Sequence, residues 1–322
     1  MGERKQRLTS RRRVIRALAL SPFTVWLRAS EPPQEDHSFT LSATVSRVIL
    51  DVSVKNKQGA YITGLVKSNF HVFEDGRSQP ILHFEAVDTP VTIGHIVDDS
   101  GSMREKRPAV IMAGLAFAKE SNPQDEFFVV NFNDSVRPGL RAGANFSDDL
   151  QKLRAALYMG RPEGKTALYD AIGFGLRHLR KGVQPKKALI VVSDGGDNAS
   201  TASESDVLAL IRASEATIYT VGLFTEDDSD RNPRTLRKIA HLSGGEYFNP
   251  QTASEVLPVF QKIAKDIRNR YAIAYAPDPK LDPVKNRERK IRVTANAPGQ
   301  GQLIVRTRTA YTVEPTPAEG RS

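Results

Sequence analysis

The chain has 322 residues, of which 39% are hydrophobic, contains no cysteine and carries a formal net charge of +9. This length allows one large or two ordinary domains with a sizeable core, which excludes a wholly disordered protein. The lack of cysteine excludes structural disulfides and thiolate zinc sites. Residues 1–29 carry eight basic side chains against one acidic side chain, a net of +7, so only about +2 of the total charge of +9 remains elsewhere. A nucleic-acid-binding surface spread over the chain is therefore not supported.

The N-terminal tail has the pattern of an export signal. A basic segment at residues 10–16 precedes a moderately apolar stretch at residues 17–27, with small residues near a possible cleavage point. The consecutive arginines of this segment resemble those of twin-arginine signals. The apolar stretch is too short for an ordinary membrane-spanning helix, so we expect no integral membrane span. We predict that residues 1–30 export the protein to the periplasm, the cell envelope or the medium, or else form a disordered basic tail of a cytoplasmic protein.

The two flanks of the chain show the period-two alternation that is typical of antiparallel strands. The first flank is residues 38–88, a small β module, and the second is residues 271–312. Neither flank has enough strands to be stable alone, so we expect them to pair into one discontinuous, antiparallel β-sandwich-like domain. Residues 313–322 are predicted to be a disordered tail. The strands are expected near residues 48–54, 70–73, 81–84, 271–275, 290–295 and 302–309.

Residues 91–270 alternate between buried strands and helices, which predicts an α/β domain with a doubly wound, mostly parallel, Rossmann-like sheet. The strands are recognised by short apolar runs and the helices by apolar residues on one face. The expected strands are residues 91–97, 127–132, 187–193, 216–221 and 246–248, and the expected helices are residues 109–119, 149–157, 166–179, 205–213, 233–242 and 254–267.

Oxygen-bearing side chains follow two of these apolar strands. Asp98, Ser100 and Ser102 come directly after the first strand and alternate, so a tight loop can turn all three towards one point. A carboxylate with two hydroxyls suits a hard ion such as Mg²⁺ or Mn²⁺ better than zinc. Taken alone, the same pattern also fits a helix N-cap followed by a turn. Two later residues favour the ion: Thr166 opens a helical pattern, and Asp194 ends a second buried strand.

In residue type, order and structural element, these five residues resemble the complete metal-ion-dependent adhesion site of von Willebrand factor type A domains. The succession of β module, α/β unit and closing strands also resembles the von Willebrand factor A-related proteins of acidobacteria. The first resemblance implies that Ser100 and Ser102 coordinate Mg²⁺ or Mn²⁺ directly, while Asp98, Thr166 and Asp194 contribute directly or through water. It also implies a protein-binding function, in which the ion accepts an Asp or Glu carboxylate from a partner protein.

Four other polar residues near these positions are given structural roles. Asp99 is expected to point away from the ion, as a helix N-cap or a surface carboxylate. Asp170 is expected to hydrogen-bond within its own helix, and Asp197 to take part in a turn. His95, inside the first strand, is expected to be a packed, hydrogen-bonded histidine and not a metal ligand.

Two alternative functions stay open. The first is a Mg²⁺-dependent phosphohydrolase with Asp98 as the nucleophile and Asp194 as a metal ligand. That chemistry requires a second carboxylate two residues after the nucleophile, where this chain has Ser100, so we do not predict an enzyme. The second alternative is a structural scaffold whose site stays unoccupied. Partner specificity is expected to lie in the loops at residues 133–145 and 224–232.

Overall fold

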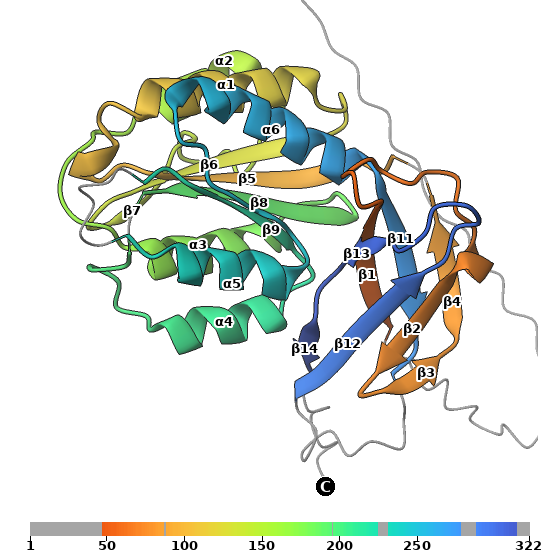
Figure 1. The fold of residues 1–322 in the computed structure, drawn as a ribbon. Helices are drawn as coiled ribbons and strands as arrows, with labels where there is room; N and C mark the ends of the chain where they lie inside the picture. The colour runs from red at the N-terminus through yellow and green to blue at the C-terminus, as the bar shows by residue number, and fades with distance from the viewer. Residues whose placement is uncertain (1–46, 87, 195, 225–230, 278–287, 314–322) are drawn as a thin grey trace, which may run out of the picture. The chain divides into compact units, whose positions relative to one another are not determined.

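A six-stranded mixed sheet forms the centre of the α/β unit in the computed structural model, which describes residues 47–86, 88–194, 196–224, 231–277 and 288–313 (Figure 1). The strand order is β10-β9-β8-β5-β6-β7, and all neighbours are parallel except β6 and β7. The predicted sheet of mostly parallel strands is confirmed, and the antiparallel edge strand β7 was not predicted. The strands are β5 (Val91–Asp98), β6 (Glu126–Phe132), β7 (Val136–Pro138), β8 (Lys186–Ser193), β9 (Thr217–Gly222) and β10 (Tyr247–Phe248).

Helices cover both faces of this sheet (Figure 1). One face carries α1 (Arg107–Glu120), α2 (Leu150–Tyr158) and α6 (Ala253–Arg268), and the other carries α3 (Leu168–Leu179), α4 (Glu204–Arg212) and α5 (Pro233–Ser243). All eight residues of β5 are buried because side chains alternate between two apolar cores. Ile93 packs into the first core and Ile96 into the second. At Gly94, an added Cβ would lie 2.3 Å from Cζ of Phe128, so the ring fits only over a glycine.

Two four-stranded antiparallel sheets form the second part of the fold, with an apolar core between them. The sheets have the orders β13-β1-β11-β4 and β14-β12-β2-β3. Since β1 pairs with β11 and β2 with β12, strands from before and after the α/β unit share both sheets, as predicted. The strands are β1 (Val48–Lys55), β2 (Phe70–Glu74), β3 (Arg77–Gln79), β4 (Ile81–Glu85), β11 (Arg270–Tyr275), β12 (Glu288–Ala295), β13 (Ile304–Arg306) and β14 (Ala310–Thr312).

Two sequence predictions about elements are wrong in detail. The strand expected at residues 302–309 is shortened to β13 (Ile304–Arg306), and a further strand that was not predicted, β14 (Ala310–Thr312), follows in the other sheet. The helix expected from Thr166 begins at Leu168, so Thr166 lies in the loop before it. Within the described residues, no helix has both the length and the apolar character to cross a membrane. The predicted export signal and residues 314–322 of the predicted tail lie outside the described residues.

Candidate functional site

The candidate site is built at the edge of the sheet where β5 and β8 end. The two strands are parallel neighbours, so Asp98 at the end of β5 lies beside Ser193 at the end of β8. Ser193 Oγ donates to Asp98 Oδ2 at 2.5 Å, and the backbone N–H of Ser100 donates to Asp98 Oδ1 at 2.8 Å. Burial raises the pKa of Asp98 to about 7; the Ser193 bond opposes this rise and the nearby charge of Asp194 adds to it.

Two hydroxyls connect Asp98 to the second carboxylate. Ser100 Oγ and Ser102 Oγ lie 3.2 Å apart, and Ser102 Oγ donates to Asp194 Oδ1 at 3.0 Å. Ser100 is the N-cap residue of a single turn of 3₁₀-helix, Gly101–Met103, which contains Ser102, and this turn brings the two hydroxyls together. The structure therefore brings four of the five predicted residues together: Asp98, Ser100, Ser102 and Asp194.

Thr166 reaches the same edge through its backbone. It is buried, its N–H donates to Asn198 Oδ1 at 2.8 Å, and its carbonyl accepts from the N–H groups of Asn198 and Ala199. The loop before α3 is also joined to residues 99–103, called the serine loop from here on, because the N–H of Gly101 donates to the carbonyl of Gly164 at 3.3 Å. Three separate segments of the chain thus meet at one edge of the sheet.

Lys106 is a part of this site that the sequence analysis missed. Its Nζ lies 2.6 Å from Asp194 Oδ2, and its side chain is 18% exposed whereas that of Asp194 is 2% exposed. Both oxygens of Asp194 therefore have partners, one hydroxyl and one ammonium. The only signal in the sequence was the basic run from Arg104 to Arg107, which does not indicate which side chain turns towards the carboxylates.

Asp99 is not the surface or N-cap carboxylate that we predicted. It is fully buried, and its Oδ1 forms an ion pair with Nε of Arg107 at 3.1 Å. Burial raises the pKa of Asp99, and the charge of Arg107 opposes that rise. Arg107 is buried in turn and donates to Asn131 Oδ1 at 3.0 Å and to the carbonyl of Leu157. This ion pair joins the serine loop to the first residue of α1, so Asp99 has a structural role next to the site.

The other two aspartates organise the loop that follows β8. Asp197 accepts from the hydroxyl of Ser200, a local bond that agrees with the predicted turn role, and also from the N–H of Tyr169 at 3.0 Å, which ties the loop to the start of α3. Asp170 accepts from the N–H groups of Thr201 and Ala202. The prediction that Asp170 bonds within its own helix is therefore wrong, because it holds this loop against α3 instead.

His95 is packed as predicted, but its Nε2 has no hydrogen-bond partner among the described residues. Its ring is stacked nearly parallel to that of Phe260, with 6.1 Å between the ring centres, and contacts Phe117 edge-on. Burial without a partner lowers the pKa of His95 to about 4, so the imidazole is neutral near pH 7. The ring belongs to the apolar core and not to the candidate metal site.

The five candidate residues have the chemistry of a site for a hard divalent cation. Two carboxylates and three hydroxyls supply oxygen donors alone, which suits Mg²⁺ or Mn²⁺. Over the described residues, no group of three or more His, Cys, Asp or Glu is arranged to hold a metal, so an ion at this edge would need the hydroxyls. The buried carboxylates of Asp98 and Asp194 also repel each other, which favours a cation between them.

Comparison with known proteins identifies the α/β unit. Residues 95–196 match the family described as von Willebrand factor type A domain. A solved structure titled von Willebrand factor type A, from Catenulispora acidiphila, is 15% identical and has a TM-score of 0.50; the match covers 81% of this chain and 73% of that one. Proximal thread matrix protein 1 from the mussel byssus is 16% identical, with a TM-score of 0.49, over 61% of this chain and 51% of its own.

A third structure is the von Willebrand factor domain of the type V pili tip protein Mfa5 from Porphyromonas gingivalis. It is 15% identical and has a TM-score of 0.45, over 56% of this chain and 96% of its own. No curated protein matches the chain. The residues that match the family begin within β5 and end just after Asp194, so they include all five candidate residues. Residues 95–196 are therefore similar to a von Willebrand factor type A domain.

Proposed function

We propose that this protein is a cation-dependent protein-binding module. In this proposal Asp98, Ser100, Ser102, Thr166 and Asp194 hold one Mg²⁺ or Mn²⁺ ion, with Ser100 and Ser102 coordinating directly. The bound ion supplies a Lewis-acidic position that accepts an Asp or Glu carboxylate of a partner protein. The observation that carries the proposal is the hydrogen-bonded chain from Asp98 through Ser100 and Ser102 to Asp194.

The surrounding residues prepare the site for this role. Ser193 and the N–H of Ser100 orient Asp98, so that its carboxylate is fixed before any ligand arrives. Asp194 is held by Ser102 and Lys106. The two carboxylates of the set balance the charge of a divalent ion without exceeding it, so no excess negative charge repels a third carboxylate, and Lys106 adds one positive charge beside the site. Phosphoryl transfer is less well supported, because Ser100 stands where a general acid would be needed.

A titration with Mg²⁺ tests the ion. The unfolding temperature of the wild type should rise with Mg²⁺. The ion should raise the free energy of unfolding by about 2.7 kcal/mol when its free concentration is a hundred times its dissociation constant. The variants Asp98→Asn and Ser100→Ala should fold but lose this stabilisation. Release of p-nitrophenol from p-nitrophenyl phosphate, measured in parallel, should not exceed that of the Asp98→Asn variant. Turnover that depends on Asp98 would instead support the phosphohydrolase, and no Mg²⁺ effect would support the structural scaffold.

Selection of phage-displayed peptides tests the partner chemistry. Peptides bound in Mg²⁺ and released by chelator should each contain Asp or Glu, and Asp98→Asn should recover none of them. Enrichment that persists with chelator present would contradict the proposal, because the carboxylate would then bind without the ion.

The proposal also places the protein outside the cytoplasm, exported by residues 1–30, with the α/β domain at residues 91–270 and the flanks 38–88 and 271–312 forming the second domain. Recovery of the mature chain from a periplasmic or culture fraction, followed by N-terminal sequencing, tests the export. A start at Met1 in a cytoplasmic fraction would contradict it.

A further inference from the structure

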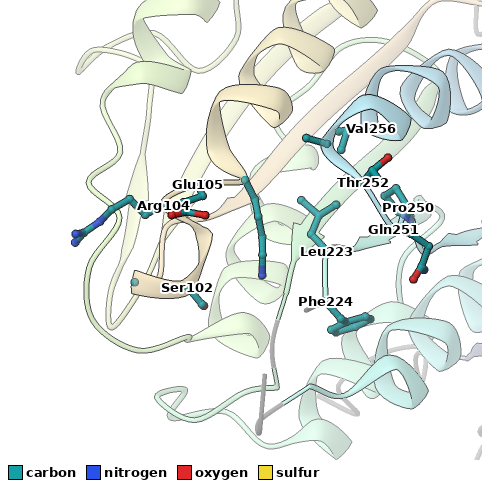
Figure 2. Close-up of a pocket in the computed structure, with 12 residues that line it drawn as sticks. Ser102, Arg104, Glu105, Leu223, Phe224, Pro250, Gln251, Thr252 and Val256 are labelled. Atoms are coloured by element: carbon teal, nitrogen blue, oxygen red, sulfur yellow. The ribbon is translucent and has the colours of Figure 1, made fainter. Parts of the chain in front are cut away.

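A cavity of about 600 Å³ opens directly beside the candidate metal site. Ser102 and Lys106 line it on one side, so the cavity and the metal site share a border. The other side is formed where β9 ends and α6 begins. Figure 2 shows Ser102 on one side and Leu223, Phe224 and Val256 on the other. A ligand on the metal site is therefore adjacent to an apolar wall.

This apolar wall is fixed by the core beneath it. Leu223 and Val256 are only 5% and 1% exposed and belong to the apolar core under α1 and α6. The ring of Phe224 lies against Gly222, where an added Cβ would be 2.4 Å from Cε2 of the ring. Because these side chains are held from behind, the wall exists before a ligand binds. The volume of this cavity lies in the range of ligand-binding sites, and its lining combines apolar with polar residues.

The side nearest the metal site is polar. Arg104, Glu105 and Lys106 line it, together with the hydroxyl of Ser102, and the ammonium of Lys106 is paired with Asp194. With the proposed ion in place, an acidic group of a ligand is favoured at this border and an apolar group at the opposite wall. Neighbouring residues of a peptide are about 3.8 Å apart at their Cα atoms. A residue next to a metal-bound Asp or Glu can therefore place its side chain in the cavity.

We propose that this cavity is the specificity subsite of the metal site, and that it takes an aromatic or large aliphatic side chain next in sequence to the partner's acidic residue. This inference rests on the proposed function, because the metal-bound carboxylate places the partner. The ligand class is accordingly a protein segment in which one acidic and one large apolar residue are adjacent. The ion supplies attraction for any carboxylate, and the cavity selects among them.

Two tryptophan variants at the start of α6 separate the subsite from the metal site. Ala253 lines the cavity, whereas the next residue, Ser254, is exposed in the same helical turn and does not line it. The variant Ala253→Trp should fill the cavity, and Ser254→Trp is the matched control. The probes are three fluorescein-labelled peptides with a blocked C-terminus, containing the sequences Gly-Phe-Asp-Gly, Gly-Asp-Phe-Gly and Gly-Ser-Asp-Gly. Binding is followed by fluorescence polarisation in Mg²⁺ and in chelator, and Mg²⁺ affinity by calorimetry without peptide.

In Mg²⁺, at least one phenylalanine peptide should bind the wild type about tenfold more tightly than the serine peptide, since burial of the ring adds affinity. Ala253→Trp should abolish this preference, and Ser254→Trp should keep it. Equal affinity of the three peptides for the wild type, or a preference that survives Ala253→Trp, would overturn the subsite while leaving metal-dependent binding in place. If none of the peptides binds in a Mg²⁺-dependent manner, the proposed function fails and the subsite fails with it.

Discussion

Two buried aspartates in this protein have opposite surroundings. Asp266, on α6, accepts from Arg270 at 2.6 Å and 3.0 Å and from the hydroxyls of Tyr219 and Ser53 at 2.8 Å and 2.9 Å. Burial alone would raise its pKa, but the charges of Arg270 and Lys55 hold that pKa well below its ordinary value. Asp98 is equally buried, accepts from two neutral groups and faces Asp194, and its pKa is raised to about 7.

The difference shows that the partners of a buried carboxylate, and not its burial, distinguish Asp266 from Asp98. Asp266 has permanent cationic partners and joins α6 to the sandwich strand β1 through Ser53, so its charge is fully compensated within the chain. Asp98 lacks a cationic hydrogen-bond partner among the described residues and lies at the C-terminal end of β5. A buried charge without a cation is costly, and a bound ion would remove that cost.

The largest expected effect follows from breaking the compensated pair. Asp266→Asn should lower the free energy of unfolding by about 3 to 5 kcal/mol, because it leaves the buried guanidinium of Arg270 without its carboxylate. The measurement is urea unfolding in the presence of chelator. The matched change at the other aspartate, Asp98→Asn, should alter the free energy of unfolding by no more than about 1 kcal/mol, because it removes repulsion with Asp194. Equal destabilisation by both variants would show that the two aspartates do not differ as described.

His95 sharpens the comparison, because it is a buried ionisable group whose pKa is shifted by burial alone. The folded pKa of about 4 lies below the ordinary value of 6.5, so protons bind preferentially to the unfolded chain. The neutral His95 therefore contributes to the free energy of unfolding above pH 6.5. That contribution, about 3 kcal/mol in all, is lost as the pH falls from 6.5 towards 4. His95→Phe should remove this part of the pH dependence. The test is the difference between the two unfolding curves from pH 7.5 to pH 4; a constant difference would contradict the assignment.

Substitution of Lys106 gives the smallest expected effect. It tests whether the ammonium of Lys106 partly neutralises the negative charge of Asp194 when no ion is bound. An ammonium at Asp194 and a divalent cation repel each other, so Lys106 should weaken ion binding while stabilising the metal-free protein. Lys106→Met should tighten Mg²⁺ binding about tenfold and lower the stability in chelator by about 1 kcal/mol. The matched control is Arg104→Met, since Arg104 is exposed and its guanidinium donates to the carbonyl of Pro162. Weaker Mg²⁺ binding by Lys106→Met would mean that Lys106 orients Asp194 and does not compete with the ion.

The sequence predicted the elements of the candidate site better than its electrostatics. The apolar runs that end at Asp98 and Asp194 were sufficient to place both residues at one edge of the sheet, because the carboxyl ends of parallel strands meet there. The burial of Asp99 could not be predicted, since it depends on Arg107 reaching back from α1. The role of Lys106 depends in the same way on the direction of one flexible side chain. The short strand β13 and the unpredicted β14 after it are set by pairing with β1 and β12, which are distant in sequence.

Anomalous diffraction from crystals grown with Mn²⁺ tests the central claim most directly. The account predicts one strong anomalous peak bounded by Ser100 Oγ, Ser102 Oγ and the side chains of Asp98, Thr166 and Asp194, and no such peak in Asp98→Asn crystals. A peak that is absent from this position at saturating Mn²⁺, or one that persists unchanged in Asp98→Asn, would contradict the account.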